Sequence, residues 1–163
     1  DRMKKALPNT KVTNFLALTQ LRPDLPEDRR AVEWIAEGCN VFNAFVPFYT
    51  NVDKTPEYLA ITGEEPDSNQ FYWANRLIGA LADAHFGACA NLIERYQNKV
   101  AARAHALLKE GDRGETGENP SLYLEARNEK MAAMAKEETQ KVLGQVLYAA
   151  SNGMKNGFAR SDA

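Results

Sequence analysis

The stretch Phe71–Leu108, FYWANRLIGALADAHFGACANLIERYQNKVAARAHALL, contains no proline and is rich in the residues that favour helices. Apolar side chains recur every three or four positions, most clearly from Leu92 onward, and so mark one helical face. The residues of this face are Leu77, Leu81, Leu92, Tyr96, Val100, Ala104 and Leu107 or Leu108. Gly87 weakens the pattern, because a glycine inside a helix costs about 1 kcal/mol relative to alanine. We predict two helices in series, or one bent helix, with a break near His85-Phe86-Gly87.

Three segments before Thr50 show the alternation of side chains that is typical of β-strands. They are Val12–Leu21, Ala31–Glu37 and Val41–Tyr49. The first is rich in β-branched and aromatic residues, so we expect it to be covered on both faces. Pro47 cannot donate a main-chain hydrogen bond and places the end of the third strand at a sheet edge or a bulge. The strand-rich region, 12–50, therefore predicts a hairpin or meander of three antiparallel strands.

Helices are expected to fill the rest of the chain, over 55–157. Thr55-Pro56 is a helix-start signal for a short helix, and Asn119-Pro120 is another for a long helix over Ser121–Asn152. Lys109–Asn119 holds three glycines and no apolar residue, which indicates a loop. The buried stripe of the last helix is expected at Leu124, Met131, Met134, Val142, Val146 and Ala149 or Ala150. The fold class is α+β.

Composition excludes several classes of protein. The chain has 163 residues, 44% of them hydrophobic, which suffices for one domain with a core. A net charge of −2 argues against a nucleic-acid partner, and no apolar run reaches the roughly 20 residues of a membrane span. The two cysteines fit free thiols in a reducing cytoplasm, and no pair of cysteines or histidines has zinc spacing. The chain begins at Asp1 and not at methionine, so we expect the natural N-terminus to lie upstream.

No complete active site is visible in the residues. His85 and His105 lie 20 positions apart on predicted helices, where packed or exposed histidines are the commoner case. Cys39 falls in a predicted turn, and Cys89 stands among alanines as a small core residue. The fold could still bring either histidine against Cys39, and the sequence leaves that open. We predict no catalytic residue and no metal or cofactor site.

Several blocks of the sequence resemble one family. They are Gln20–Pro26, Val46–Val52 with Thr55-Pro56, Tyr72–Ile78 with Ala80–Asp83, Ile93–Gln97, Val146–Ala150 and Met154–Asp162. In this order, and over almost the whole chain, they are similar to the C-terminal part of the dipeptidase A family. These are bacterial cysteine dipeptidases of the N-terminal-nucleophile hydrolase class.

The resemblance implies an enzyme that hydrolyses dipeptides with broad specificity and without a metal or other cofactor. In that class the nucleophile is the cysteine at the mature N-terminus, which also supplies its own amine as the base. The chain would then be a single C-terminal portion, 1–163, of a larger αββα fold whose nucleophile lies upstream. Its exposed strands would favour a homo-oligomer. The alternative is a non-catalytic helical module for interaction or oligomerisation.

Arg22 is the one candidate for substrate binding. It follows the first predicted strand, and its guanidinium could contact a substrate carboxylate or an oxyanion. A structural ion pair is the alternative.

Overall fold

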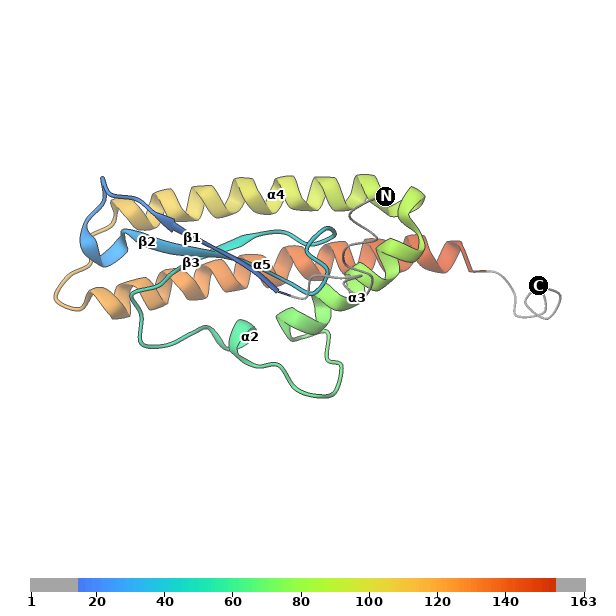
Figure 1. Ribbon diagram of the computed structural model, residues 1–163, viewed down its shortest axis with the longest axis horizontal. Coiled ribbons are helices and arrows are strands. Elements are labelled where there is room, and N and C mark those ends of the chain that lie inside the picture. Colours follow the sequence, from blue (N-terminus) through green and yellow to red (C-terminus); the bar gives the residue numbers. More distant parts are fainter. Residues whose placement is uncertain (1–14, 155–163) are drawn as a thin grey trace, which may run out of the picture.

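The computed structural model describes residues 15–154 and shows the predicted α+β fold (Figure 1). Strands β1 (Phe15–Leu21), β2 (Ala31–Glu37) and β3 (Val46–Tyr49) form an antiparallel sheet in the order β1-β2-β3. A 3-10 turn, η1 (Glu27–Arg29), joins β1 to β2. The helices are α2 (Glu57–Ala60), α3 (Phe71–Ala84), α4 (Phe86–Arg113) and α5 (Pro120–Asn152). The expected strand residues 12–14 and the expected helical residues 155–157 lie outside the described part.

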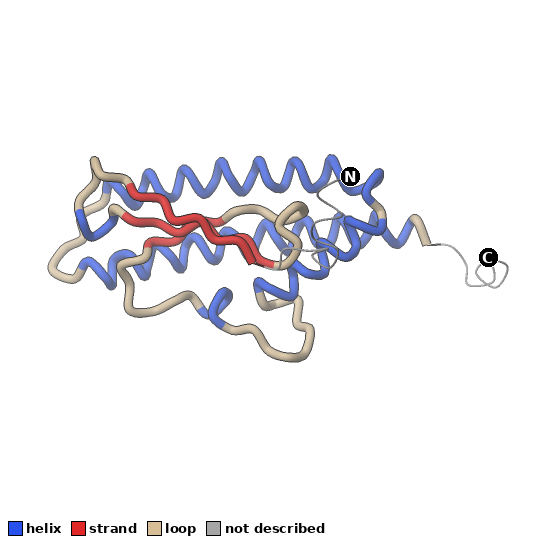
Figure 2. The backbone as a smooth tube through the Cα atoms, viewed as in Figure 1, coloured by secondary structure: helices blue, strands red, loops and turns tan. Residues whose placement is uncertain are grey.

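The two long helices form the frame on which the sheet lies. They run antiparallel along the length of the molecule, with the strands beside them and α3 at one end (Figures 1 and 2). Tyr96 of α4 and Thr139 of α5 meet in a buried hydrogen bond of 3.1 Å between their hydroxyl oxygens. The Trp34 ring of β2 lies 5.2 Å from the His105 ring of α4, so this face of the sheet packs on α4.

The predicted break in the central stretch is confirmed at His85. The His85 amide donates to the Leu81 carbonyl at the end of α3, and the His85 carbonyl accepts from Cys89 at the start of α4. Because each helix has its own buried stripe, the expected position of Leu77 is wrong: its side chain is 41% exposed. The α3 residues that are buried are Phe71, Ala74, Asn75, Ile78, Gly79 and Ala82.

The third strand is shorter than predicted, since it begins at Val46 and not at Val41. The side-chain amide of Asn43 donates to the carbonyls of Glu37 and Cys39, at 3.1 and 2.8 Å. These bonds hold the segment between β2 and β3 as a turn, which Gly38 enters with a positive φ of 72°. The alternation of side chains over 41–45 therefore belongs to a turn folded against α3, where Asn43 also donates to the Asn75 carbonyl.

The predicted start of the loop at Lys109 is also wrong, because helix α4 continues to Arg113. Gly111 lies inside the helix, where a Cβ atom would stand 2.5 Å from the Tyr49 hydroxyl oxygen. This glycine allows close packing and does not end the helix. The predicted start of the last helix is confirmed, since the Asn119 side chain accepts a hydrogen bond from the Leu122 amide at 3.2 Å.

The first strand is not covered on both faces, contrary to expectation. Most of its side chains are exposed among the described residues, including Phe15, Leu18 and Leu21. The helices pack on β2 and β3, where Val32, Ala36, Val46 and Phe48 are buried, and leave β1 at the margin.

Candidate functional site

Arg22 lies at the end of β1 in a network of buried and half-buried groups. One terminal nitrogen of its guanidinium donates to an Asp112 carboxylate oxygen at 2.6 Å, and the other donates to the Arg29 carbonyl at 2.5 Å. The second oxygen of Asp112 accepts from the Tyr49 hydroxyl at 2.9 Å. Within the Arg22 guanidinium, the remaining nitrogen, Nε, is buried and has no hydrogen-bond partner among the described residues. The structure thus shows the ion pair that the sequence left as the alternative, and contact with substrate stays a prediction.

A cavity of about 510 Å³ opens beside this network, lined by Gln20, Arg22, Leu25, His105, Leu108, Lys109, Asp112 and Arg113. Its charged groups are mostly cations, and the one carboxylate is already bound to Arg22. A small anion or carboxylate is the ligand that such a lining attracts.

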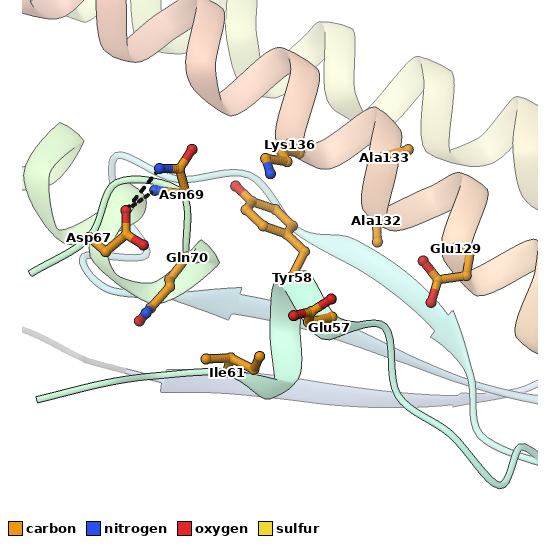
Figure 3. Close-up of a pocket in the computed structure, with 10 residues that line it drawn as sticks. All are labelled: Glu57, Tyr58, Ile61, Asp67, Asn69, Gln70, Glu129, Ala132, Ala133 and Lys136. Atoms are coloured by element: carbon orange, nitrogen blue, oxygen red, sulfur yellow. Dashed lines mark hydrogen bonds between the residues drawn. The ribbon is translucent and has the colours of Figure 1, made fainter.

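A second cavity, of about 470 Å³, lies between α2 and α5 (Figure 3). Carboxylates from Glu57, Asp67 and Glu129 line it, and the Lys136 ammonium stands 5.5 Å from the centre of the Tyr58 ring. Asp67 is engaged locally, because one of its oxygens accepts from the main-chain and side-chain nitrogens of Asn69. Its lining includes neither cysteine nor histidine. The cavity can hold a polar ligand, but it offers no nucleophile.

The most unusual site is a group of three polar side chains, the buried Asn43 and Asn75 and the half-buried Glu37, which we call the polar cluster. Asn75 of α3 has 0% exposure, and neither its amide nitrogen nor its amide oxygen has a partner among the described residues. The amide oxygen of Asn43 and one carboxylate oxygen of Glu37 are also buried without a partner. A buried polar group left unpaired costs about 1–3 kcal/mol, so such groups call for an explanation.

The three residues of the polar cluster come together because the turn after β2 folds against the first turns of α3. The side-chain amide nitrogen of Asn43 donates to the main-chain carbonyl oxygens of Glu37 and Asn75, each at 3.1 Å. Gly38 packs so closely that a Cβ atom there would stand 2.9 Å from the Asn75 carbonyl carbon. Burial raises the pKa of Glu37. The cluster therefore offers an unused amide donor, unused acceptors and a carboxyl group that binds its proton more readily than usual.

A third cavity, of about 330 Å³, is lined by Cys39, Val41, Phe42, Arg76, Gly79, Ala80 and Asp83. Its lining comes from the turn after β2 and from α3, and it includes none of the three side chains of the polar cluster.

No hydrogen bond in the described part of the chain joins either cysteine side chain to a base. Cys39 packs against Gly79, and Cys89 is buried in the core, where burial raises the pKa of its thiol. The ring of His105 stacks on Trp34, while His85 lies against Gly153. No hydrogen bond between 15 and 154 joins a histidine to Cys39, so the arrangement that the sequence left open is not seen.

Sequence reasoning missed the polar cluster, although one signal was present. Asn75 falls on the same helical face as Phe71, Ile78 and Ala82, which is where a buried polar residue stands out. Among residues 15–154, no group of three or more histidine, cysteine or acidic side chains could hold a metal ion. No helix in that part is long and apolar enough to cross a membrane.

Known proteins match the chain over most of its length. A dipeptidase of Bifidobacterium longum (strain NCC 2705) is 39% identical over 90% of the chain and 35% of its own length. A probable dipeptidase A of Streptococcus pyogenes serotype M18 is 39% identical over 92% of the chain and 32% of its own length. Dipeptidase A of Lactobacillus helveticus is 32% identical over 80% of the chain and 28% of its own length.

The chain thus spans about a third of the length of the curated relatives that it matches. Residues 5–99, which include all three strands, α3 and the polar cluster, match the sequence profile of Peptidase family C69. On these matches, the chain belongs to Peptidase family C69.

Proposed function

We propose that this chain is the C-terminal portion, 1–163, of a cysteine dipeptidase that hydrolyses dipeptides of broad specificity. The observation that carries the proposal is the match to proteins named dipeptidases over 80–92% of the chain. The nucleophile, an N-terminal cysteine, would come from the rest of the longer protein, since neither Cys39 nor Cys89 is hydrogen-bonded to a base among residues 15–154. No observation favours the alternative of a non-catalytic helical module.

The assay is dipeptide hydrolysis by the longer protein and by the 163-residue chain, each with Cys39→Ser and Cys89→Ser variants. We expect activity only in the longer protein, and no effect of either substitution beyond stability. Thiol-dependent turnover by the short chain that one substitution abolishes would contradict the proposal and identify an internal nucleophile.

Arg22 forms a further part of the proposal, as the contact for the substrate carboxylate. Its support is the cation-lined cavity beside it, and its competitor is the ion pair with Asp112. In Arg22→Lys, a role in binding predicts a higher KM with kcat unchanged. A lower Tm with unchanged KM would leave the residue with the ion pair alone.

Localisation in the cytoplasm and assembly as a homo-oligomer complete the proposal. The two cysteines are free thiols, as a reducing compartment would keep them. Sedimentation of the purified longer protein decides the assembly, and a single monomer species at high concentration would argue against it.

A further inference from the structure

The two outer edges of the sheet differ, and the hydrogen-bond pattern shows how. Just beyond β1, the Arg22 amide donates to the Arg30 carbonyl at 2.9 Å, in register with the Leu21–Ala31 pair. In an antiparallel pair, such bonds occur at every second residue. Leu16, Leu18 and Gln20 therefore bond to β2, whereas the main-chain groups of Ala17, Thr19 and Leu21 point away from the sheet.

On the other side, β3 ends the sheet. The Thr50 amide donates to the Ala31 carbonyl at 3.4 Å, so by the same alternation Pro47 and Tyr49 point outward. Pro47 has no amide hydrogen to satisfy. The side chain of Asn128, from α5, accepts from the Tyr49 amide at 2.9 Å and donates to the Tyr49 carbonyl at 3.0 Å. This edge has no unpaired donor left for a further strand.

The outer edge of β1 is open. Among residues 15–154, nothing pairs with the outward main-chain groups of Ala17, Thr19 and Leu21. The strand, FLALTQL, carries neither a charge nor a proline, the devices by which exposed edges avoid pairing. Its apolar side chains are exposed on both faces of the sheet: Phe15 by 56%, Leu18 by 62% and Leu21 by 69%.

We propose that β1 is an inner strand of a larger sheet, and that its outer edge pairs with a strand from the remaining part of the same dipeptidase polypeptide. This inference rests on the proposed function. The relatives that match the chain are about three times as long, which leaves ample chain to supply the strand and to cover both faces of β1. The family profile matches residues 5–99, a range that includes β1, so the strand belongs to the part of the chain that the family shares.

A second copy of this chain is the competing occupant. Two β1 edges could pair across a two-fold axis, but that pairing would cover only the edge strand of each copy. The exposure of Phe15 and Leu21 on one face and of Leu18 on the other favours further layers on both sides. A continuous polypeptide supplies such layers beside the added strand.

Amide hydrogen exchange of the longer protein tests the inference residue by residue. If another strand pairs with β1, the amides of Ala17, Thr19 and Leu21 exchange slower than free amides by on the order of a thousandfold or more. Leu16, Leu18 and Gln20 bond to β2 in either case and serve as internal controls. Fast exchange at the outward amides beside slow exchange at the controls would overturn the inference.

Dilution distinguishes the two occupants, since protection by a second copy disappears as the assembly dissociates to monomers. Such a loss would also overturn the inference. Protection that persists at all concentrations, in a protein that fails to hydrolyse dipeptides, would support the strand and refute the proposed function. Dipeptide hydrolysis in a protein whose outward β1 amides exchange fast would support the proposed function and refute the added strand.

A substitution gives a second, independent measurement. Thr19→Pro removes an outward amide hydrogen and no bond to β2, as Pro47 does naturally on β3. We expect the Tm of the longer protein to fall by several degrees more than in Thr19→Ala, which keeps the amide hydrogen. Equal Tm values for the two variants would mark β1 as a true edge.

Discussion

Replacing Asn128 by alanine tests how the sheet is closed at β3. The side chain is 2% exposed, and its two hydrogen bonds satisfy the main-chain nitrogen and oxygen of Tyr49. Tyr49 is itself buried, so water cannot simply replace the lost partner. Leaving a buried polar group unpaired costs about 1–3 kcal/mol, and two such groups give about 2–6 kcal/mol. That is a large fraction of the roughly 5–15 kcal/mol that stabilises a typical domain.

The assay for Asn128→Ala is urea unfolding, followed with exchange at the Tyr49 amide. Asn98→Ala is the matched control, because it is the same substitution in the middle of a long helix but at an exposed position. The gain in helix propensity is common to both variants, so their difference reports the two hydrogen bonds together with the packing of the buried side chain. A difference below about 1 kcal/mol would refute the reasoning, as it would mean that water or a shifted backbone satisfies Tyr49.

Two further predictions concern stability. Gly79→Ala should destabilise the protein by about 1–3 kcal/mol in denaturant unfolding, because its new Cβ would stand 2.6 Å from the Cys39 Cβ. Gly144→Ala, which has open space around it, should stabilise the protein by about 0.5–1 kcal/mol. Equal changes in the free energy of unfolding for the two variants would contradict the packing described at Gly79. Burial opposes ionisation of Glu138, but hydrogen bonds from Lys99 and Arg103 outweigh it and lower its pKa, and those from Lys141 and Arg103 lower the pKa of Glu137 to about 2. Since both carboxylates have folded-state pKa values below the ordinary value of 4.5, their contribution is fully present above that pH and is lost as pH falls toward 2. A Tm that declines over this range in the native protein, and declines less in Glu138→Gln, is the expected result, while parallel declines would assign the acid sensitivity elsewhere.

Local patterns were sufficient to predict most of the helices and two strands. The break at His85 follows from a glycine near the middle of a long helical stretch, and the start of α5 follows from Asn119-Pro120. Both signals act within a few residues of the event that they predict. The errors occurred where a distant contact decides. Gly111 continues α4 because Tyr49 needs the space, and the alternation before Val46 becomes a turn because Asn43 binds three carbonyls.

The candidate site was less predictable than the fold for the same reason. Arg22 was identified by its place after a strand, but its partner Asp112 lies 90 positions away in the sequence. No spacing rule connects two such residues. The polar cluster likewise forms only when the turn after β2 meets α3, so the sequence could show that Asn75 stands on a buried helical face but not that its amide lacks a partner.

Two buried asparagines of this chain, Asn128 and Asn75, show how differently a buried amide can affect stability. Both lie on helices, and both are almost fully removed from solvent. Asn128 uses its amide nitrogen and oxygen to bond the main chain of Tyr49. These two hydrogen bonds offset the free-energy cost of burying its polar amide, and they close the edge of the sheet. Asn75 uses neither atom within residues 15–154, and an apolar side chain of the same size would relieve about 1–3 kcal/mol there. The amide therefore adds to stability at one position and opposes it at the other, and the difference is whether the fold brings a main-chain partner to it.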